Sequence, residues 1–394
     1  MASIQKRPDG RYRARYRDEA DKEHSRHFKR KVDAQRWLDE VTASVVRGDY
    51  VAPNAGDETV QAFAERWLTM QPLRSSSSYG YNSHLTRHVY PAFGSRRLSS
   101  IAPSDIQAWV RNLATGDPSR KVKPLAPTTI GVVHAILYSV FAAAVLDRKI
   151  KANPCASTKL PKDEKDRQIV PMSTEQMRKL EAGVPPALRA MIVLGAGTGM
   201  RQSEALGLTV DRIDFLRKTL RVDRQLLAVP GESPRLGPPK TKASIRTIPL
   251  PQVVVEALAE HLALYPVDNV GALPGLVFTR AWPLPDGSFL REPWTRQRFG
   301  HVWRPVARTV GLAPGTGFHA LRHYYASLLI RHGESVKTVQ ARLGHASATE
   351  TLDTYAHLWP DSDDRTRDAI DSVLGLQTAA SENDSQKSRG LPAD

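Results

Sequence analysis

The sequence predicts an α+β protein of several domains: a small β-sheet with one helix, then an all-helical domain, then a mainly helical domain with a small antiparallel sheet. Period-two alternation dominates the first part, helical spacing dominates the second, and short strand patterns interrupt helices in the third. A chain of 394 residues with 41% hydrophobic content is long and apolar enough for two or three cores. The predicted domains are residues 1–55, 57–155 and 165–375, followed by a disordered tail over 376–394.

A basic strand characterises the first domain. Its arginines alternate with Tyr or Ala, so their guanidinium groups share one face of the strand. These arginines are Arg11, Arg13, Arg15 and Arg17. A turn at Pro8-Asp9-Gly10 precedes the strand, and residues 22–30 predict a further basic strand. The pattern favours a DNA-binding sheet, and it also fits a solvated edge strand protected from aggregation.

A helix is expected to cover the other face of this sheet. Asp33 can cap its start, and Trp37, Val41 and Val45 recur at a spacing of four residues. We therefore expect a three-stranded sheet with one helix packed against it.

The second domain is predicted to be a helical bundle. A loop of Pro, Asn and Gly at 53–56 separates it from the first domain. Residues 59–70 and 125–146 carry apolar side chains at helical spacing, and Pro103 opens a helix between them. This pattern by itself indicates only an all-helical fold.

The third domain follows a polar linker over residues 153–166. Within it, residues 211–215, 219–223 and 244–249 predict three short strands among helices.

The charge of the chain indicates a polyanionic partner. The formal net charge is +15, and residues 361–394 hold 8 acidic and 4 basic side chains, so the excess lies in the preceding body. A folded basic body is what phosphate neutralisation requires, although many soluble proteins are basic without binding DNA.

Cysteine content and hydropathy exclude other classes of protein. The single cysteine, Cys155, excludes an internal disulfide and a thiolate cluster, and points to a reducing cytoplasm. We expect no membrane-spanning helix, because we expect every apolar run to fall short of the ~20 residues that such a helix needs. We also expect no signal peptide, because the first residues are charged.

A glycine-rich stretch precedes the first candidate site residue. Gly195, Gly197 and Gly199 resemble a phosphate loop only weakly, because no strand precedes them and the third spacing of GxGxxG is missing. Arg201 follows at a helix start, with Glu204 three residues later on the same face. A guanidinium held by a carboxylate suits a phosphate, and an ordinary surface ion pair explains the pair equally well.

Two further groups of residues carry candidate chemistry. Lys240 and Lys242 lie just before a predicted strand, and His319 and Arg322 stand at i and i+3 on one helix. His319 and His323 imitate half of a zinc motif, but residue 320 is Ala where HExxH needs Glu, which excludes a metalloprotease site. The HxxR spacing alone is uninformative, because it also occurs at His27, His84 and His301.

The order of these residues resembles the tyrosine recombinase family of phage integrases. The residues that match the family's catalytic pattern are, in chain order, Arg201, Lys240, His319-x-x-Arg322, His345 within Leu343-Gly344-His345, and Tyr355 within Thr354-Tyr355-Ala356-His357. The resemblance covers the third domain. It implies that residues 57–155 are a core-site binding domain and that residues 1–55 are an arm-site binding domain.

The resemblance also implies the chemistry. Tyr355 would be the nucleophile, Arg201 and Arg322 would clamp the phosphate, and His319 and His345 would donate hydrogen bonds to it. Lys240 would protonate the leaving 5′ oxygen, with Lys242 as its rival, and Glu204 would orient Arg201 or His319. Covalent catalysis by Tyr requires neither a metal nor a cofactor. Tyr324 and Tyr325 are rival nucleophiles, but they lie in an apolar helix where packing is their expected role.

We therefore expect a site-specific DNA recombinase that integrates phage or mobile-element DNA through a 3′-phosphotyrosine intermediate and a Holliday junction. The family works as a tetramer on two duplexes, which predicts a docking helix over residues 361–375, with Ala369, Ile370, Val373 and Leu374. Other implied partners are core and arm attachment sites, a host DNA-bending protein and an excision factor. Alternatives are a type IB topoisomerase-like enzyme and a non-catalytic DNA-binding regulator.

Overall fold

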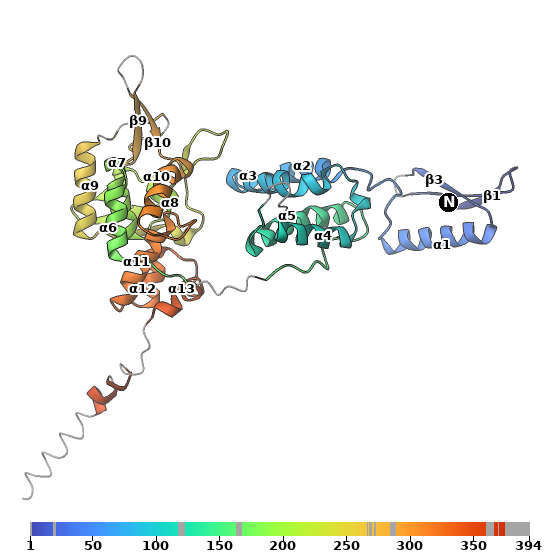
Figure 1. Ribbon diagram of the computed structural model, residues 1–394. Helices are drawn as coiled ribbons and strands as arrows, with labels where there is room; N and C mark the ends of the chain where they lie inside the picture. The colour runs from blue at the N-terminus through green and yellow to red at the C-terminus, as the bar shows by residue number, and fades with distance from the viewer. Residues whose placement is uncertain are drawn as a thin grey trace, which may run out of the picture. The chain divides into compact units, whose positions relative to one another are not determined.

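The structure is a computed structural model, in which two compact units divide the chain between residues 166 and 167 (Figure 1). It describes residues 2–18, 21–116, 123–162, 168–265, 267, 270–271, 273–283, 289–359, 366–368 and 370–374. The predicted tail over 376–394 lies outside the described residues, as does Ala369 of the predicted docking helix.

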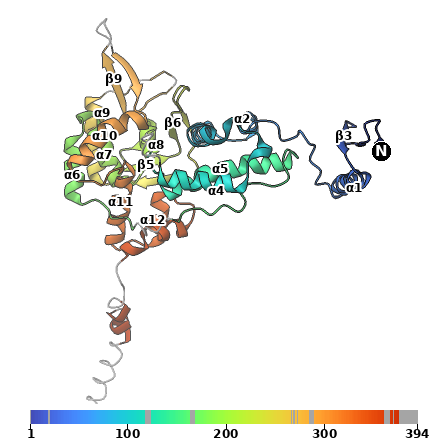
Figure 2. The ribbon, with the colours of Figure 1, turned by 45° about the vertical axis from the view of Figure 1, so that its right-hand side comes forward.

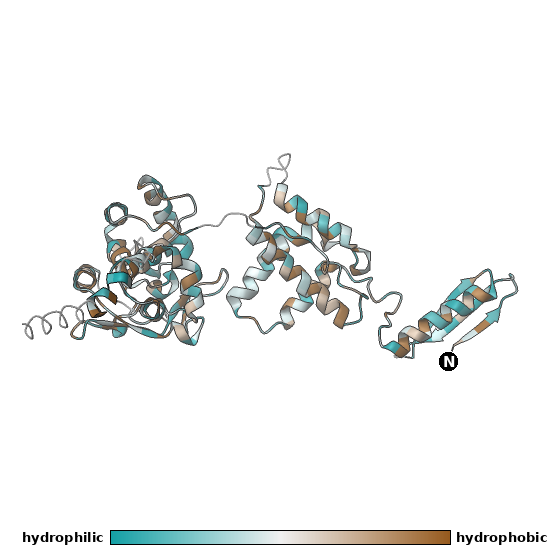
Figure 3. Ribbon diagram, turned by 90° about the horizontal axis from the view of Figure 1, so that it is seen from below, coloured by the Kyte–Doolittle hydropathy of each residue, from teal (hydrophilic) through white to brown (hydrophobic). Residues whose placement is uncertain are grey.

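The amino-terminal segment forms an antiparallel sheet of three strands in the order β1-β2-β3. Its elements are β1 (Ser3–Lys6), β2 (Tyr12–Arg17), β3 (Glu23–Phe28) and α1 (Lys31–Arg47). Ala14 and Tyr16 point from β2 into a small core with Ala34 and Leu38 of α1. The sheet and its helix are therefore as predicted, and Figure 3 shows the apolar stripe along α1 beside largely hydrophilic strands.

Arg13, Arg15 and Arg17 of β2 lie opposite this core, as the alternation predicted, whereas Arg11 precedes the strand, which begins at Tyr12. Arg13 donates to Oε1 of Glu23 over 3.1 Å, and Arg15 donates to Oγ of Ser3 over 2.8 Å. The capping role of Asp33 is wrong. Arg30 occupies the cap position of α1 without a side-chain cap, and Asp33 accepts from the guanidinium of Arg30 at 3.0 and 3.1 Å. Because the helix starts two residues before Asp33, this carboxylate lies in the first turn, where it interacts favourably with the helix dipole.

Residues 59–150 form a helical bundle with its own core (Figure 2). Its elements are α2 (Val60–Met70), α3 (Ser75–His84), the π-helix η1 (Leu85–Gly94), η2 (Leu98–Ser100), α4 (Pro103–Thr115) and α5 (Pro127–Leu146). Thr59 caps α2 by accepting from the backbone N–H of Ala62, which explains why the helix begins where the sequence predicted. The sequence did not predict α3 and η1, in which serines and Pro91 weaken the helical signal.

The expectation that no apolar run reaches the length of a membrane span is wrong for α5. This 20-residue helix is long and apolar enough to cross a membrane, with a mean hydropathy of 2.1 and few charges. Its apolar length arises because it is the central helix of the bundle. Ile130, Leu137 and Phe141 are fully buried among α2, η1 and α4, so the core of the domain explains this face of the helix, whereas Val132 and Leu146 are exposed.

The predicted linker is partly ordered. Gln107 of α4 exchanges two hydrogen bonds with the backbone of Lys159, at 2.9 and 3.1 Å. The first part of the predicted linker therefore packs on the helical bundle, and residues 163–167 lie outside the described residues.

The carboxy-terminal unit is mainly helical. Its helices are α6 (Thr174–Gly183), α7 (Pro186–Thr198), α8 (Gln202–Leu206), η4 (Val210–Arg212), η5 (Lys242–Ser244), α9 (Gln252–Leu264), α10 (Arg296–Thr309), α11 (His319–Arg331), α12 (Val336–Leu343), α13 (Ala348–Tyr355) and η6 (Ala356–Leu358). The large core centres on α7, which packs against α9 and α11. In Figure 1, α12 and α13 lie together beyond the end of α11.

In the part of this unit that the structure describes, three small sheets accompany these helices. Their strands are β4 (Ile213–Asp214), β5 (Thr219–Val222), β6 (Gln225–Leu227), β7 (Arg235–Gly237), β8 (Arg246–Pro249), β9 (Thr279–Pro283) and β10 (Phe289–Pro293). The predicted strands correspond to the sheet β4-β5-β8, although short 3₁₀ turns replace the start of the first and third. The hairpins β6-β7 and β9-β10 were not predicted from the sequence.

The glycine-rich stretch belongs to α7 and its end. A Cβ on Gly195 would lie 2.7 Å from Cζ of Phe318, and one on Gly197 would collide with Val254. These glycines therefore allow close packing of helices, which agrees with the weak phosphate-loop signal. Gly199 ends α7 with a φ of 63°, a left-handed conformation that suits glycine.

Candidate active site

Arg201 lies immediately after the turn that ends α7. Its backbone N–H donates to Oε2 of Glu204 at 3.0 Å, and Nη1 donates to Oε1 of the same carboxylate at 3.0 Å. Nη1 also donates to Oγ of Ser244 at 3.1 Å, and Nη2 donates to the carbonyl of Gly344 at 3.3 Å. Contacts from separate parts of the chain thus hold one partly exposed guanidinium in a fixed orientation.

Glu204 is a buried carboxylate shared by two arginines. Arg246 of β8 donates from Nη2 to Oε2 of Glu204 at 2.9 Å, and only 6% of its side chain is exposed. Burial alone would raise the pKa of Glu204, but the charges and hydrogen bonds of Arg246 and Arg201 outweigh it and hold the pKa below its usual value. Glu204 therefore contacts Arg201, one of the two residues that it was expected to orient, and no hydrogen bond joins it to the other, His319, among the described residues.

Sequence reasoning missed Arg246. The signal was present, because Arg246 stands two and four residues before the buried Ile248 and Leu250. Residues at this spacing share one face of an extended chain, so Arg246 lies on the core face of its strand. Its Nε donates to the carbonyl of Arg342 at 2.8 Å, which joins β8 to the end of α12.

Arg322 is a buried cation on α11. It is 1% exposed, and Nη1 donates to the carbonyl of Gly199 at 2.8 Å. Its Nε has no hydrogen-bond partner, and within the described part of the chain no carboxylate lies within 4.0 Å of its guanidinium. Burial, followed by the charges of Arg201 and Arg246, lowers the pKa of Arg322 to about 9, so it remains charged at neutral pH. A buried charge without a counterion is costly, and an anionic ligand would relieve that cost.

His319 and His323 lie one turn apart on α11. Their rings meet edge to face with centroids 4.7 Å apart. His319 retains an exposed face, yet the surrounding protein reduces its hydration. That loss and the nearby charges of His323, Arg322 and Arg201 lower the pKa of His319 to about 4. At neutral pH both rings are neutral, because burial and Arg322 also lower the pKa of His323 to about 4.

His345 is fixed between α12 and α13. Its Nδ1 lies 2.8 Å from Oγ1 of the buried Thr351, and its Nε2 lies 3.7 Å from Oε1 of Glu350. Burial and Arg322 lower the pKa of His345 to about 4, against an opposing effect of Glu350, so the contact with Glu350 is not an ion pair at neutral pH. The sequence contained no local signal for the role of Thr351.

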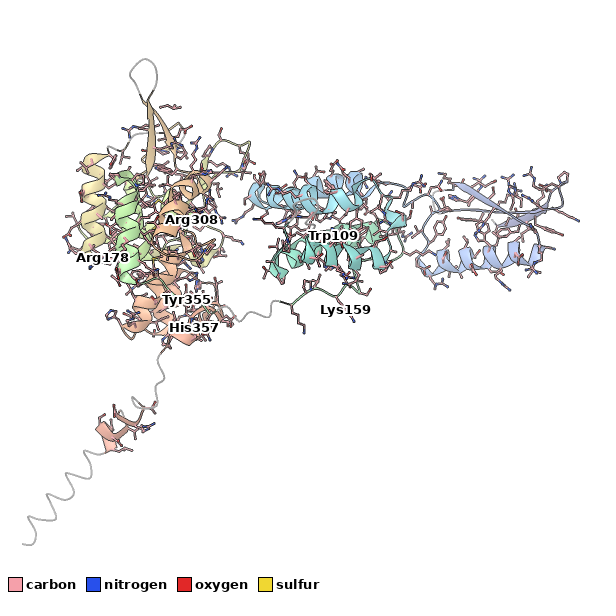
Figure 4. All side chains as sticks on the ribbon, in the orientation of Figure 1. Trp109, Lys159, Arg178, Arg308, Tyr355 and His357 are labelled. Carbon is pink, nitrogen blue, oxygen red and sulfur yellow. The ribbon has the colours of Figure 1, made fainter. Side chains whose placement is uncertain are left out.

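Tyr355 is the last residue of α13 and is 1% exposed. Its ring is parallel to that of His345 at a centroid distance of 6.4 Å, and its hydroxyl lies 2.9 Å from Nδ1 of His323. Burial raises the pKa of Tyr355 to about 12, although Arg322 partly opposes this. Figure 4 shows Tyr355 and His357 in the same part of the carboxy-terminal unit.

The rival tyrosines belong to the packing of α11. Tyr324 is 6% exposed, and its hydroxyl lies 3.0 Å from Oγ1 of Thr174. Tyr325 is 8% exposed and packs in a small core with Val339 and Leu343. These contacts agree with the packing role that the sequence favoured for both.

Lys240 and Lys242 lie on the connection between β7 and β8 and are exposed. Between them, Oγ1 of Thr241 lies 2.9 Å from Oγ of Ser244, which in turn accepts from Arg201. The loop is therefore attached to Arg201, and neither lysine is paired with a carboxylate of the described residues.

The described residues thus bring Arg201, Glu204, Arg322, His345 and Tyr355 together, with His319 and His323 beside them. Guanidinium groups, imidazoles and a phenol converge here, which is a set able to bind a phosphate and to attack it. Within the described stretches, no group of three His, Cys, Asp or Glu side chains is arranged to hold a metal ion.

Three family models match the chain. The phage integrase family matches residues 172–361, the phage integrase N-terminal domain matches residues 2–47, and the phage integrase N-terminal SAM-like domain matches residues 59–114. The first match includes every residue of the site.

Curated relatives agree with these matches. The XerC-like tyrosine recombinase of Caldanaerobacter subterraneus is 30% identical over 67% of this chain and 69% of its own length. The phiRv2 prophage integrase of Mycobacterium tuberculosis is 24% identical over 84% of each chain.

Among solved structures, the Tn1549 transposon integrase in complex with a circular intermediate DNA has a TM-score of 0.63. It is 21% identical, and the match covers 80% of this chain and 99% of that one. A lambda integrase dimer bound to a core site has a TM-score of 0.54 at 16% identity, over 91% and 96% of the two chains. The chain belongs to the phage integrase family of tyrosine recombinases.

Proposed function

We propose that this protein is a site-specific DNA recombinase that cuts and rejoins duplex DNA through a 3′-phosphotyrosine intermediate and a Holliday junction. The observation that carries the proposal is the buried guanidinium of Arg322, which has no carboxylate partner among the described residues and lies near the nucleophile candidate Tyr355. A phosphodiester is the anion that such a site would bind, and the phenol is the group that would attack it.

The proposed cleavage begins with attack of the Tyr355 oxygen on the scissile phosphorus. With the pKa of Tyr355 raised to about 12, the phenolate is rare at pH 7, which corresponds to a barrier contribution of about 7 kcal/mol if the free phenolate attacks. Arg201 and Arg322 offset part of this cost by neutralising charge on the non-bridging oxygens, where one preorganised donor is worth about 3 kcal/mol.

The remaining side chains handle protons. Lys240 protonates the departing 5′ oxygen, and Lys242 is its rival from the other side of Thr241. His345 and His319 donate hydrogen bonds to the phosphate. They are neutral in the DNA-free protein, and the negative charge of a bound phosphodiester raises their proton affinity. Glu204 does not react; it holds Arg201 and Arg246 in place.

The test is covalent trapping on a DNA substrate nicked near the cleavage point, so that a short fragment diffuses away after cleavage. The wild-type chain should form an adduct, and Tyr355→Phe should form none. Tyr324→Phe is the matched control, because it removes a buried phenol that contacts Thr174 and lies outside the site. An adduct with Tyr355→Phe would contradict the assignment of the nucleophile.

A second duplex distinguishes recombination from related activities. Strand joining to a separate duplex is expected of a recombinase. Relaxation of supercoils without joining would indicate a type IB topoisomerase-like enzyme, and DNA binding without any adduct would indicate a non-catalytic regulator.

Assembly is the third part of the proposal. We propose that four copies of the chain assemble as a homotetramer on two DNA duplexes. In this assembly residues 361–375 of each protomer dock on a neighbouring protomer. The exposed Ile370, Val373 and Leu374 of the helical residues 370–374 support this. Ile370→Glu with Val373→Glu should reduce tetramer formation on DNA while single-site cleavage persists, and unchanged assembly would remove the docking role.

The DNA partners follow from the domain order. The sheet of residues 1–55 would bind arm sites, the bundle of residues 57–155 would bind core sites, and residues 165–375 would carry catalysis. The product is phage or mobile-element DNA joined to the chromosome in the cytoplasm of a bacterial host, with a DNA-bending protein and an excision factor as accessory partners.

A further inference from the structure

We propose that His323 holds the hydroxyl of Tyr355 and accepts its proton when that oxygen attacks the scissile phosphate. The inference rests on the proposed strand-cleavage function and adds a residue for which the sequence offered only a rejected zinc motif. It makes His323 a catalytic residue, because the ring contacts the reacting atom directly.

The geometry singles out His323 among the histidines of the site. Its Nδ1 lies 2.9 Å from the Tyr355 oxygen, with ring centroids 5.6 Å apart. His345 is not placed to take this proton, since its Nδ1 lies against Thr351 and its Nε2 faces Glu350. His319 meets the ring of His323 and has no hydrogen bond to Tyr355 in the described structure.

The protonation states give the hydrogen bond its direction. Burial, with the charge of Arg322, lowers the pKa of His323 to about 4, and burial raises the pKa of Tyr355 to about 12. Both groups are therefore neutral near pH 7, and the phenol O–H donates to an unprotonated Nδ1 while Nε2 carries the imidazole proton.

The titratable groups around this pair come from two helices and from the turn that precedes the second one. His319 and Arg322 lie on α11 with His323, Glu350 lies on α13 with Tyr355, and His345 precedes α13. Of these, Arg322 opposes protonation of His323. A phosphodiester bound to Arg322 would weaken that opposition, so substrate binding prepares His323 to accept a proton.

Bonds and protons balance in the proposed step. The bond from the Tyr355 oxygen to phosphorus forms, the bond from phosphorus to the 5′ oxygen breaks, and the phenolic proton passes to Nδ1 of His323. A separate acid, Lys240 in the proposed function, supplies the proton of the leaving 5′ hydroxyl. The wide gap between the two pKa values excludes complete transfer before attack, so the proton moves as the new bond forms. In the rejoining step the proton returns from His323 to the phenolic oxygen.

The experiment measures single-turnover cleavage of the nicked substrate at several pH values between 7 and 9. His323→Phe removes the acceptor, and His323→Asn retains a hydrogen-bonding atom near the position of Nδ1 but has no proton affinity. Both should cleave about 10²- to 10⁴-fold more slowly than wild type at pH 7. The deficit should shrink by up to about tenfold for each pH unit, because hydroxide replaces the missing base. His332→Asn, at the exposed end of α11, is the matched control and should cleave like wild type.

A second substrate separates the two proton transfers. When sulfur replaces the leaving 5′ oxygen, the departing thiolate needs no proton, so Lys240→Ala should recover on this substrate while both His323 variants remain slow. Wild-type rates for His323→Asn, a deficit independent of pH, or recovery of the His323 variants on the sulfur substrate would each overturn the proposal.

Two controls separate a folding defect from a chemical one. Thermal unfolding of each variant should match wild type within a few degrees, and His323→Asn preserves side-chain polarity if His323→Phe does not fold. If the wild-type chain forms no adduct, the proposed function fails. If the wild-type chain forms an adduct and His323→Asn cleaves as fast as wild type, only the proposed role of His323 fails.

Discussion

At the scale of residues, the site concentrates positive charge that the protein itself does not neutralise. Glu204 offsets part of the charge of Arg201 and Arg246, whereas Arg322 donates to the carbonyl of Gly199, a neutral acceptor. The imidazoles of His319, His323 and His345 are neutral near pH 7, because burial and the nearby positive charges lower their pKa values. A ligand with a negative charge therefore changes the electrostatics of every group in the site at once.

This arrangement predicts sensitivity to acid. The pKa of His345 is about 4 in the folded protein, whereas an unfolded histidine titrates near 6.5. Between these values only the unfolded chain binds the proton, so the stability present above pH ~6.5 is lost as the pH falls toward 4. The contribution of this buried ring is at most about 3 kcal/mol.

Urea unfolding of wild type and His345→Gln at pH 4.5 and 7.5 tests this. The difference in unfolding free energy between the two pH values should be smaller in the variant, because one proton uptake has been removed. His332→Gln, which alters an exposed histidine, should leave the difference unchanged. An equal difference in His345→Gln would show that His345 is not responsible.

At the scale of elements, one buried arginine ties β8 to two helices. Arg246 contacts Glu204 of α8 and the carbonyl of Arg342 at 2.8 Å in α12, and it lies beside Gly344, which precedes His345. The strand, the Arg201 turn and the His345 turn are thus joined by a single side chain. The packing glycines of α7 add to this, since they let α9 and α11 approach the helix that ends at Gly199.

Removing Arg246 should destabilise the domain strongly. Arg246→Met leaves the carboxylate of Glu204 buried with Arg201 as its remaining cation, and the expected decrease in unfolding free energy is about 3 to 5 kcal/mol. The double variant Glu204→Gln with Arg246→Met should be destabilised by less than the sum of the two single variants, because the buried charge is then absent.

The measurement is equilibrium unfolding of the three variants. Arg221→Met is the control, since Arg221 is an exposed residue of the neighbouring strand β5 that pairs with the partly buried Asp223, and it should contribute less than about 1 kcal/mol. Additive effects in the double variant would argue against a shared network.

At the scale of the whole molecule, the basic residues behind the net charge of +15 include two distinct sets of arginines. Arg201, Arg246 and Arg322 form the positive site of the carboxy-terminal unit. The sheet of residues 1–55 holds another set on the face opposite its core, where Arg13 and Arg15 are oriented by Glu23 and Ser3. Both sets lie on folded elements, so each can meet phosphates in a fixed geometry.

The sheet face predicts a measurable salt effect. In the full chain, replacing Arg11, Arg13, Arg15 and Arg17 with Gln should weaken DNA binding. The slope of log affinity against log salt should flatten by about 0.9 for each phosphate that the variant no longer neutralises. Cleavage of a short core-type substrate should persist, because the catalytic residues are unchanged. An unaltered slope would support the interpretation of this face as a solvated edge.

Sequence patterns alone predicted the sheet and helix of the first domain, the helical character of the second, the order of the site residues and the family resemblance. Period-two alternation located β2, apolar residues at helical spacing located α2, and an ordered set of residues predicted the chemistry; that set is Arg201, Lys240, His319, Arg322, His345 and Tyr355. These signals are local or depend only on the order of residues along the chain, so they can be recognised without a three-dimensional structure.

Packing in three dimensions established which groups touch. It placed Arg246 on Glu204 and His323 on the hydroxyl of Tyr355, through pairs separated by 42 and 32 positions in the chain. It also showed that the apolar helix α5 contributes one buried face to the core of the bundle and that Asp33 lies inside α1. Burial and neighbouring charge set the pKa values of the site, and both depend on which elements pack together rather than on any local pattern of residues.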